Sequence, residues 1–222
     1  MKKYVLIAAG GSGTRINAKE PKQFILINGK PMLMHTIVRF TAYDPSVSLI
    51  LALPQIHHEY WNRLCSDLGF NIPHILIAGG ETRFDTVRNG LSCIQDEGIV
   101  FIHDGVRPFV SQETIRKCYE TALSKGNAIP VIPVTESVRQ LDKNGNFPVN
   151  REQYVLIQTP QTFRVSLIQK AYEQEYLPEF TDDASVLEKT GVKINLVEGN
   201  RENIKITWPE DLIYAKSLLK NH

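Results

Sequence analysis

The feature that most constrains the fold of this chain is a regular alternation of short apolar runs with longer amphipathic segments. The apolar runs are rich in Val, Ile and Leu, a composition typical of buried strands. They cover residues 4–7, 47–53, 75–78, 99–102 and 128–134. Because segments with helical periodicity separate these runs, the pattern predicts an α/β fold with a mainly parallel, twisted sheet flanked by helices.

The segments between the runs carry signals for helix starts and ends. The expected helices run from Pro31 to Asp44, from Pro54 through Leu68, from Thr82 to Ile94 and from Ser111 to Lys125. The apolar face of the second helix is expected to comprise Ile56, Tyr60, Leu64 and Leu68. In the third helix, Thr82 and Asp85 have the spacing of a capping box.

A glycine-rich turn follows the first apolar run. Gly10, Gly11 and Gly13 let the backbone approach a ligand, and Arg15 and Lys22 add fixed positive charge beside them. The turn fits neither of two known phosphate loops, because it lacks the lysine of the Walker loop and the third glycine of the dinucleotide fingerprint. A turn that merely closes a strand is the alternative, but the two cations favour a polyphosphate site.

Two further polar turns, residues 79–85 and 103–108, follow the third and fourth apolar runs. The carboxyl ends of parallel strands lie at one edge of a sheet, where open α/β sheets bind their ligands. We therefore expect all three turns to line one site.

The strand–helix rhythm ends at Thr135. Residues 137–142 and 147–151 flank the turn signal at 143–146, so an extended β-arm is expected over 136–152. A two-stranded arm is marginally stable alone, which favours packing on a second subunit in a homodimer. An arm that folds back on its own domain is the alternative.

The last third of the chain is expected to return to the core at residues 154–159. A helix is expected over 165–176, a helix cap with two carboxylates at 181–185, and closing strands at 193–198 and 203–206. Thr207 and Glu210 have capping-box spacing for a final helix.

Composition excludes several classes of function. The chain has 25 basic and 24 acidic residues and a net charge of +1, so no global charge favours nucleic acid or a membrane surface. Cys65, Cys93 and Cys118 are odd in number and lie in apolar-periodic segments, which indicates reduced thiols. The apolar run near Met1 is too short for a signal peptide, and no later run is long enough to span a bilayer, so a cytoplasmic protein is expected.

Taken together, the motifs make the chain similar to the 2-C-methyl-D-erythritol 4-phosphate cytidylyltransferase family from end to end. The resemblance rests on Ala8-Ala9-Gly10 with Gly11, Gly13 and Arg15, on Pro21-Lys22-Gln23, Gly79-Gly80 with Arg83, His103-Asp104 with Arg107-Pro108, Thr159-Pro160-Gln161, residues 181–185 and Asn203-Ile204-Lys205. It implies a single Rossmann-like nucleotidyltransferase domain over 1–222, with the β-arm dimerising. It also implies a reaction that joins CTP and 2-C-methyl-D-erythritol 4-phosphate and expels pyrophosphate.

The resemblance also implies which residues form the site. The catalytic cations would be Arg15, Lys22 and Lys205. The CTP site would comprise Ala8, Ala9, Gly10, Gly11, Gly13, Gly80, Glu81, Arg83, Thr86 and Asp104. The acceptor site would comprise Asp104, Arg107, Ser137, Arg151 and Thr181, some of them from the partner subunit.

Mg²⁺ is the implied cofactor, held mostly by phosphates and water, with Asp104 as the expected protein ligand. Read from the residues alone, Asp104 could equally be a turn-capping aspartate. Ser137 replaces the threonine usual in the family but keeps the hydroxyl. The acceptor phosphate is largely ionised near neutral pH, so no general base is needed and His103 is expected to be structural.

Three alternatives stay open at this point. A ribitol-5-phosphate cytidylyltransferase shares the first loop and the His103-Asp104 motif, although residues 181–185 and 201–205 favour the methylerythritol family. A non-catalytic nucleotide-binding regulatory protein on the same fold is the alternative from another class. An NAD-dependent oxidoreductase is a more distant third, because the third glycine of its fingerprint is missing.

Overall fold

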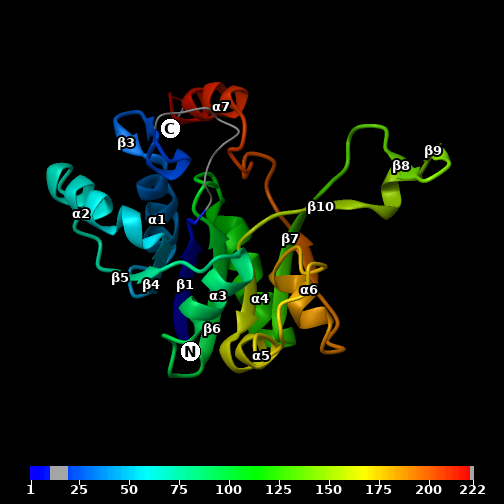
Figure 1. Ribbon diagram of the computed structural model, residues 1–222, viewed down its shortest axis with the longest axis horizontal. Helices are drawn as coiled ribbons and strands as arrows, with labels where there is room; N and C mark the ends of the chain where they lie inside the picture. The colour runs from blue at the N-terminus through cyan, green and yellow to red at the C-terminus, as the bar shows by residue number, and fades with distance from the viewer. Residues whose placement is uncertain (11–19, 221–222) are drawn as a thin grey trace.

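The computed structural model of the protein describes residues 1–10 and 20–220, which fold around one central sheet (Figure 1). The sheet order is β10-β7-β11-β6-β1-β4-β5, and β12 also pairs with β7. The strands are β1 (Lys2–Ala8), β4 (Ser48–Leu53), β5 (Ile75–Ala78), β6 (Gly98–Asp104), β7 (Asn127–Pro133), β10 (Val155–Ile157), β11 (Gln161–Arg164) and β12 (Leu196–Glu198). Strands β5, β4, β1 and β6 run parallel, which confirms the predicted α/β fold.

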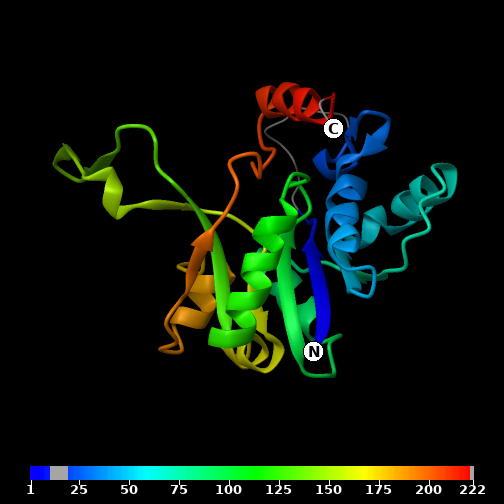
Figure 2. The ribbon, with the colours of Figure 1, turned by 180° about the vertical axis from the view of Figure 1, so that it is seen from behind.

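Helices cover both faces of the sheet (Figures 1 and 2). Helices α1 (Met32–Tyr43), α2 (His58–Asp67) and α4 (Gln112–Lys125) contribute to the core on one face, and α3 (Arg83–Leu91), α5 (Val165–Ala171) and α6 (Asp183–Glu188) to the core on the other. Successive side chains of a strand point to opposite faces. Accordingly, Val5 and Ile7 of β1 lie in the first core, and Tyr4 and Leu6 lie in the second.

The predicted apolar face of α2 is wrong in part. Ile56 is 82% exposed and Leu68 is 41% exposed, whereas Trp61 is completely buried. The helix proper begins at His58, after a 3-10 turn over Gln55–His57, so Ile56 lies outside the register of the helix. Burial of the large indole of Trp61 then sets which face of the helix meets the core.

The last third of the chain differs most from the sequence prediction. The sheet contains β11, an unpredicted strand that lies antiparallel between β6 and β7. Residues 203–206 form no strand; this irregular segment is held by side chains, and Ile206 is buried against α7 (Pro209–Lys220). Helix α5 ends at Ala171, five residues before the predicted end.

The final helix is also capped differently from the prediction. A carboxylate oxygen of Asp211 accepts hydrogen bonds from the N–H groups of Thr207 and Trp208, both at 2.8 Å. The reciprocal partner is therefore Asp211 rather than Glu210. An acidic residue at either position suits the positive end of a helix, so spacing alone did not separate them.

Two hairpins lie outside the central sheet. Strands β2 (Leu26–Ile27) and β3 (Lys30–Pro31) form a short one, and β8 (Arg139–Asp142) pairs antiparallel with β9 (Gly145–Pro148) in the other. The second hairpin forms the tip of the β-arm, residues 136–152, which projects away from the rest of the chain in both views (Figures 1 and 2). Among residues 1–10 and 20–220, no helix has both the length and the apolar character needed to cross a membrane.

Candidate active site

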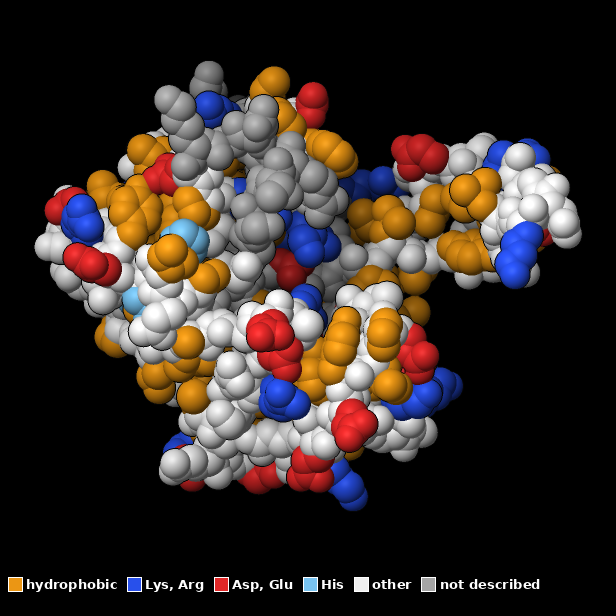
Figure 3. Space-filling view, in the orientation of Figure 1, with side chains coloured by type: hydrophobic (Ala, Val, Ile, Leu, Met, Phe, Trp, Pro, Cys, Tyr) orange, Lys and Arg blue, Asp and Glu red, His pale blue; other side chains and the backbone are white. Residues whose placement is uncertain are grey.

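Residues 8–10 at the end of β1 meet the predicted polar turns at the carboxyl ends of β5 and β6, and together they line a cavity of about 300 Å³. Figure 3 shows a hollow on this face in which basic and acidic side chains gather. The described lining residues are Ala8, Ala9, Gly10, Lys22, Gln23, Gly80, Glu81, Thr82, Arg83, Thr86, Asp104, Val106 and Lys205. We call this the first cavity.

A second cavity, of about 270 Å³, adjoins the first. Its described lining residues are Arg83, Asp104, Arg107, Ile157, Gln158, Thr159, Gln161, Thr181, Asp182 and Lys205. The two cavities share Arg83, Asp104 and Lys205. The charged groups at the boundary therefore face both spaces at once.

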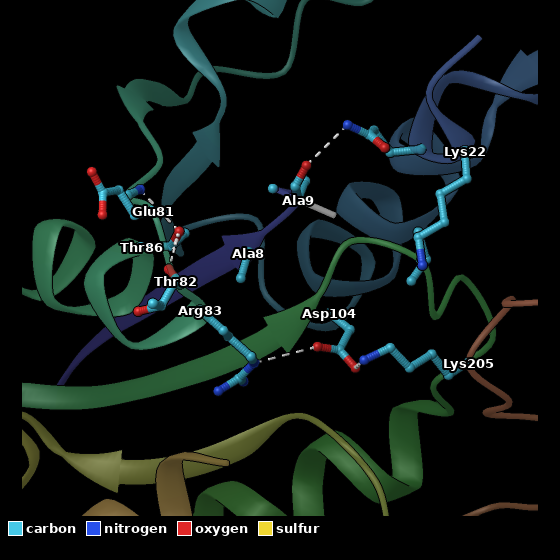
Figure 4. A pocket seen from close by; sticks show the side chains of 13 residues that line it. Ala8, Ala9, Lys22, Glu81, Thr82, Arg83, Thr86, Asp104 and Lys205 are labelled. Carbon is cyan, nitrogen blue, oxygen red and sulfur yellow. Dashed lines mark hydrogen bonds and ion pairs between the residues drawn. The ribbon is translucent and has the colours of Figure 1, made fainter. Parts of the chain in front are cut away.

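Asp104 is the centre of this boundary and ends strand β6 (Figure 4). Its Oδ2 accepts a hydrogen bond from Arg107 Nε at 3.1 Å and lies 3.2 Å from Lys205 Nζ. Its Oδ1 lies 3.8 Å from Arg83 Nε. Burial by itself would raise the pKa of Asp104, but the charges of Lys205, Arg83 and Arg107 outweigh burial and hold this pKa well below its usual range.

Arg83 joins the first turn of α3 to the start of α6. Its two η nitrogens donate to the two carboxylate oxygens of Asp183, at 2.7 and 2.6 Å. Tyr172 also donates its hydroxyl to Asp183 Oδ1, at 2.6 Å. The sequence prediction treated Asp183 only as part of a helix cap, although the cap itself is made by Asp182, which accepts from the N–H of Ser185. Asp183 is therefore a site residue that sequence reasoning missed.

Lys205 reaches the boundary because the irregular segment before it is anchored by buried amides. Asn203 Nδ2 donates to the carbonyl of Thr159 at 2.8 Å, and Arg107 Nη1 donates to the carbonyl of Asn203 at 2.8 Å. Gln158 Nε2 donates to the carbonyls of Asn200 and Asn203. Gln158 and Asn203 were not predicted as site residues. Asn203 is itself the first residue of a motif that carried the family resemblance, and Gln158 directly precedes another, Thr159-Pro160-Gln161.

The wall of the first cavity opposite Lys22 is built from backbone groups that are already paired. The N–H of Ala9 donates to the carbonyl of Ala52, and the Ala9 carbonyl accepts from Gln23 Nε2 at 3.0 Å. The hydroxyl of Thr86 accepts from the N–H of Gly80 at 3.0 Å and donates to the carbonyl of Thr82 at 2.9 Å. These bonds hold the wall in one shape.

Gly80 has a steric reason to be glycine. A Cβ at this position would lie 2.2 Å from the Cβ of Asp85, closer than two carbon atoms can approach. The turn from β5 into α3 therefore packs closely against Asp85. The predicted capping box of Thr82 and Asp85 is confirmed. Next to it, the exposed side chain of Glu81 points away from Asp104 (Figure 4).

His103 lies beneath the site and is fully buried. Its Nδ1 is 3.0 Å from the hydroxyl of Thr159, and its Nε2 is 3.0 Å from the carbonyl of Arg107. A carbonyl can only accept, so Nε2 carries the proton and Nδ1 accepts from Thr159. Burial lowers the pKa of His103 to about 4, which keeps the imidazole neutral near pH 7.

The expected acceptor residues are not all brought together within the described chain. Arg107 and Thr181 line the second cavity with Asp104. Ser137 and Arg151, on the β-arm, line neither cavity; Arg151 is exposed and donates to the carbonyl of Thr135 at 2.6 Å. Gly11, Gly13 and Arg15 lie outside the described residues.

The fold and the site together define a class of protein. The sheet is mainly parallel, and two adjoining cavities lie at its carboxyl edge with fixed charges between them. This arrangement is typical of an enzyme that transfers a group between a nucleotide and a second substrate. Residues 3–221 match the family model of 2-C-methyl-D-erythritol 4-phosphate cytidylyltransferase. The chain belongs to this family, and it is a nucleotidyltransferase.

Individual relatives agree with this assignment. The chain is 52% identical over 219 residues to the 2-C-methyl-D-erythritol 4-phosphate cytidylyltransferase of Bacteroides fragilis, covering 99% of this chain and all of the relative. It is similar in structure to 4-diphosphocytidyl-2C-methyl-D-erythritol synthase of Anaerococcus prevotii, with a TM-score of 0.83, 28% identity and coverage of 99% and 96% of the two chains. The corresponding enzyme of Francisella tularensis gives a TM-score of 0.81 at 35% identity, with coverage of 98% and 99%. These matches do not favour the ribitol, oxidoreductase or non-catalytic alternatives.

Proposed function

We propose that this protein joins CTP and 2-C-methyl-D-erythritol 4-phosphate by in-line attack of the acceptor phosphate on the α-phosphorus of CTP. The products are 4-diphosphocytidyl-2-C-methyl-D-erythritol and pyrophosphate. The observation that carries the proposal is the shared boundary of the two cavities. CTP in the first cavity and the acceptor in the second would meet at Arg83, Asp104 and Lys205.

The nucleotide is assigned to the first cavity. Its wall at Ala8, Ala9, Gly10, Gly80, Glu81, Arg83 and Thr86 would receive the cytosine and ribose, with Asp104 beside the ribose. A rigid wall of backbone groups rejects a larger purine by size and reads the polar edge of the base by hydrogen bonds. The glycine turn at Gly11 and Gly13 completes this assignment from the sequence.

The chemical step needs fixed positive charge more than it needs proton transfer. The second pKa of a phosphate monoester is about 6, so the attacking oxygen is mostly ionised at neutral pH. Lys22, Lys205 and Arg15 are assigned to the triphosphate and to the charge that develops at the α-phosphorus. Lys205 is fixed by its ion pair with Asp104. His103 has no proton to move in this scheme and supports the site from below.

The acceptor is assigned to the second cavity, with Asp104, Arg107 and Thr181 contributed by its own chain. Ser137 and Arg151 are assigned to the acceptor phosphate of the other subunit. A guanidinium grips a phosphate with two parallel hydrogen bonds, which suits Arg151 to this role.

A divalent cation fits the boundary between the cavities. Among the described residues, Asp104 Oδ1 has only the long contact with Arg83, and no cluster of three or more metal-ligating side chains occurs in residues 1–10 and 20–220. A Mg²⁺ ion held mainly by phosphates and water needs few protein ligands. We assign Asp104 Oδ1 to it; when bound, the ion neutralises charge on the nucleotide phosphates.

We further propose that the whole chain acts as a single domain and dimerises through the β-arm. Leu141 and Phe147 on the arm are exposed, and so are Tyr154 to Ile157 at its base, where β10 pairs only with β7 among the described strands. The arm and its base show as apolar patches in Figure 3. A second copy of the chain would cover this surface, and the Arg151 of each subunit would then lie near the second cavity of the other subunit. The free thiols at Cys65, Cys93 and Cys118 support assignment to the reducing cytoplasm.

An assay that couples pyrophosphate release to a colour change tests the reaction. CTP with 2-C-methyl-D-erythritol 4-phosphate should release pyrophosphate, and ribitol 5-phosphate should release it much more slowly. Faster turnover with ribitol 5-phosphate would contradict the proposed acceptor.

Mixing two impaired variants, assayed at an acceptor concentration well below the KM of Arg151→Ala, tests the shared sites. In a mixed dimer of Lys22→Ala and Arg151→Ala subunits, one of the two sites has both residues intact. Random reassortment should therefore restore about a quarter of wild-type activity. Activity that stays at the level of the separate variants would refute a site built from two subunits.

A further inference from the structure

Arg83 lies near two carboxylates but is hydrogen-bonded to only one of them. Both of its η nitrogens form short hydrogen bonds to Asp183, at 2.7 and 2.6 Å, whereas its Nε lies 3.8 Å from Asp104 Oδ1. The same guanidinium could form a two-point pair with either carboxylate, since both have the same geometry. In the structure, this two-point pair is formed with Asp183.

Because Arg83 is paired with Asp183, the two carboxylate oxygens of Asp104 have different contacts. Oδ2 is already engaged by Arg107 and Lys205. Oδ1 has only the long contact with Arg83 among the described residues, and it faces the boundary of the two cavities. A guanidinium that turned from Asp183 to Asp104 would occupy this remaining oxygen.

We propose that Asp183 is a positioning residue that holds the guanidinium of Arg83 away from Asp104, so that Oδ1 of Asp104 stays available to the substrates and to the divalent cation assigned to it above. The inference rests on the proposed role of Asp104 at the reaction centre. It assigns to Asp183, which lines neither cavity, a function in the reaction that acts entirely through Arg83.

The surroundings of Asp183 suit this role. Its side chain is fully buried, and a buried carboxylate is unfavourable unless it is paired and hydrogen-bonded. Tyr172 supplies the second partner, and its ring stacks on Phe84 with centroids 4.6 Å apart. Phe84 directly follows Arg83, so the arginine and the tyrosine are fixed relative to each other. The pair is therefore held by packing as well as by charge.

The inference makes an unusual prediction for a double variant. Asp183→Asn should lower kcat/KM for 2-C-methyl-D-erythritol 4-phosphate by about 10- to 100-fold, because the released guanidinium would form a hydrogen-bonded ion pair with Asp104. Arg83→Gln in the same chain removes the competing group. The double variant Arg83→Gln/Asp183→Asn should then have a higher kcat/KM for the acceptor than Asp183→Asn alone.

A purely structural ion pair would lower the stability of Asp183→Asn, and the double variant would recover that stability, because the unpaired buried charge is then removed. A positioning role instead weakens acceptor binding by folded Asp183→Asn, at temperatures well below its melting point. Steady-state kinetics should be accompanied by calorimetric binding of the acceptor and by thermal melts. Glu113→Gln/Arg116→Gln, which neutralises an exposed pair on α4, is the matched control and should behave as wild type. A double variant as impaired as Asp183→Asn, or an Asp183→Asn enzyme within twofold of wild type, overturns the inference.

Two further measurements keep the outcome unambiguous. If Asp183→Asn does not fold, the double variant is compared with Arg83→Gln alone; acceptor binding that is more than tenfold weaker in the double variant overturns the inference, because Asp183 is proposed to act only through Arg83. Asp104→Asn is assayed in parallel. Full activity of Asp104→Asn overturns both this inference and the proposed role of Asp104, whereas its loss together with a fully active Asp183→Asn enzyme overturns this inference alone.

Discussion

The boundary between the two cavities and the β-arm are built in opposite ways, although both are assigned to substrate. At the boundary, the charged groups pair with one another within the same chain: Asp104 contacts Arg83, Arg107 and Lys205. On the arm, the side chains of Ser137 and Arg151 are exposed, and Arg151 donates to the carbonyl of Thr135.

The two regions are positioned by different parts of the protein. Groups at the end of a central strand are placed by the sheet and need no second subunit. Groups on a two-stranded arm lack a core of their own, because such a hairpin is marginally stable until another surface covers it. We therefore expect a substitution in a cavity to impair the site of the subunit that carries it, and a substitution on the arm to impair the site of the partner subunit.

The largest effect is expected for Lys22→Ala, which tests the part of the site built by a single chain. Lys22 is only 9% exposed and lines the first cavity. Loss of a fixed cation beside the reacting phosphates should lower kcat by about 100- to 1,000-fold while the protein stays folded. Kinetics and circular dichroism should be compared with Lys30→Ala, an exposed control on β3. Unchanged turnover in Lys22→Ala would remove the proposed mechanism.

A second prediction concerns the pH dependence of the framework beneath the cavities. The folded-state pKa of His103 is about 4, below its usual value of 6.5, because the imidazole is buried. A depressed histidine pKa contributes stability that is fully present above pH 6.5 and is lost as the pH falls toward 4. The free energy of unfolding should fall by about 3 kcal/mol across this window.

Urea denaturation at a series of pH values measures this loss. His103→Gln should show a shallower decline, and part of the slope should remain because burial also lowers the pKa of His35. Asp104 should contribute little in this window, since the neighbouring cations hold its pKa well below the usual range. If the free energy of unfolding falls equally steeply with pH in the wild type and in His103→Gln, protonation of the buried imidazole is not the cause of the loss of stability.

The third prediction addresses the arm. Arg151→Ala should bind CTP normally but should raise KM for the acceptor by about 10- to 100-fold, as expected for the loss of hydrogen bonds to a charged group. Arg139→Ala, on the same arm, is the control and should retain a normal acceptor KM. Analytical ultracentrifugation should find a homodimer. A fully active monomer would contradict the assignment of Arg151 to the site of a partner subunit.

The smallest effect is expected for Thr86→Ala, which tests the rigidity of the cavity wall. The hydroxyl of Thr86 ties the N–H of Gly80 to the carbonyl of Thr82. Losing this link should raise KM for CTP by about fivefold and leave the acceptor KM unchanged. Thr86→Ser keeps the hydroxyl and should restore the wild-type value. An equal loss in both variants would point to the methyl group instead.

The sequence was most informative where local rules and tertiary packing agree. Buried parallel strands such as β4 and β6 need continuous apolar runs, so they were visible as such. The capping box of Thr82 and Asp85 is a local interaction and was predicted correctly. Because parallel strands end at one edge, the meeting of residues 8–10 with the turns after β5 and β6 also followed from the sequence.

Local rules failed where contacts between distant segments decide the structure. The antiparallel insertion of β11 between β6 and β7 has no local signature, since an edge or central position depends on which strands arrive beside it. Residues 203–206 resemble a strand, yet the amides of Gln158 and Asn203 hold them in an irregular conformation that delivers Lys205.

By itself, then, the sequence determined the α/β fold, the edge of the sheet that carries the site and the family to which the chain belongs. These depend on strand periodicity, turn chemistry and motif order, which are local properties of the chain. The tertiary structure alone decided that Arg83 pairs with Asp183, so that among the described residues Asp104 Oδ1 has only a long contact. Residues 83 and 183 are distant in sequence, and their pairing depends on the packing of α3 against α5 and α6.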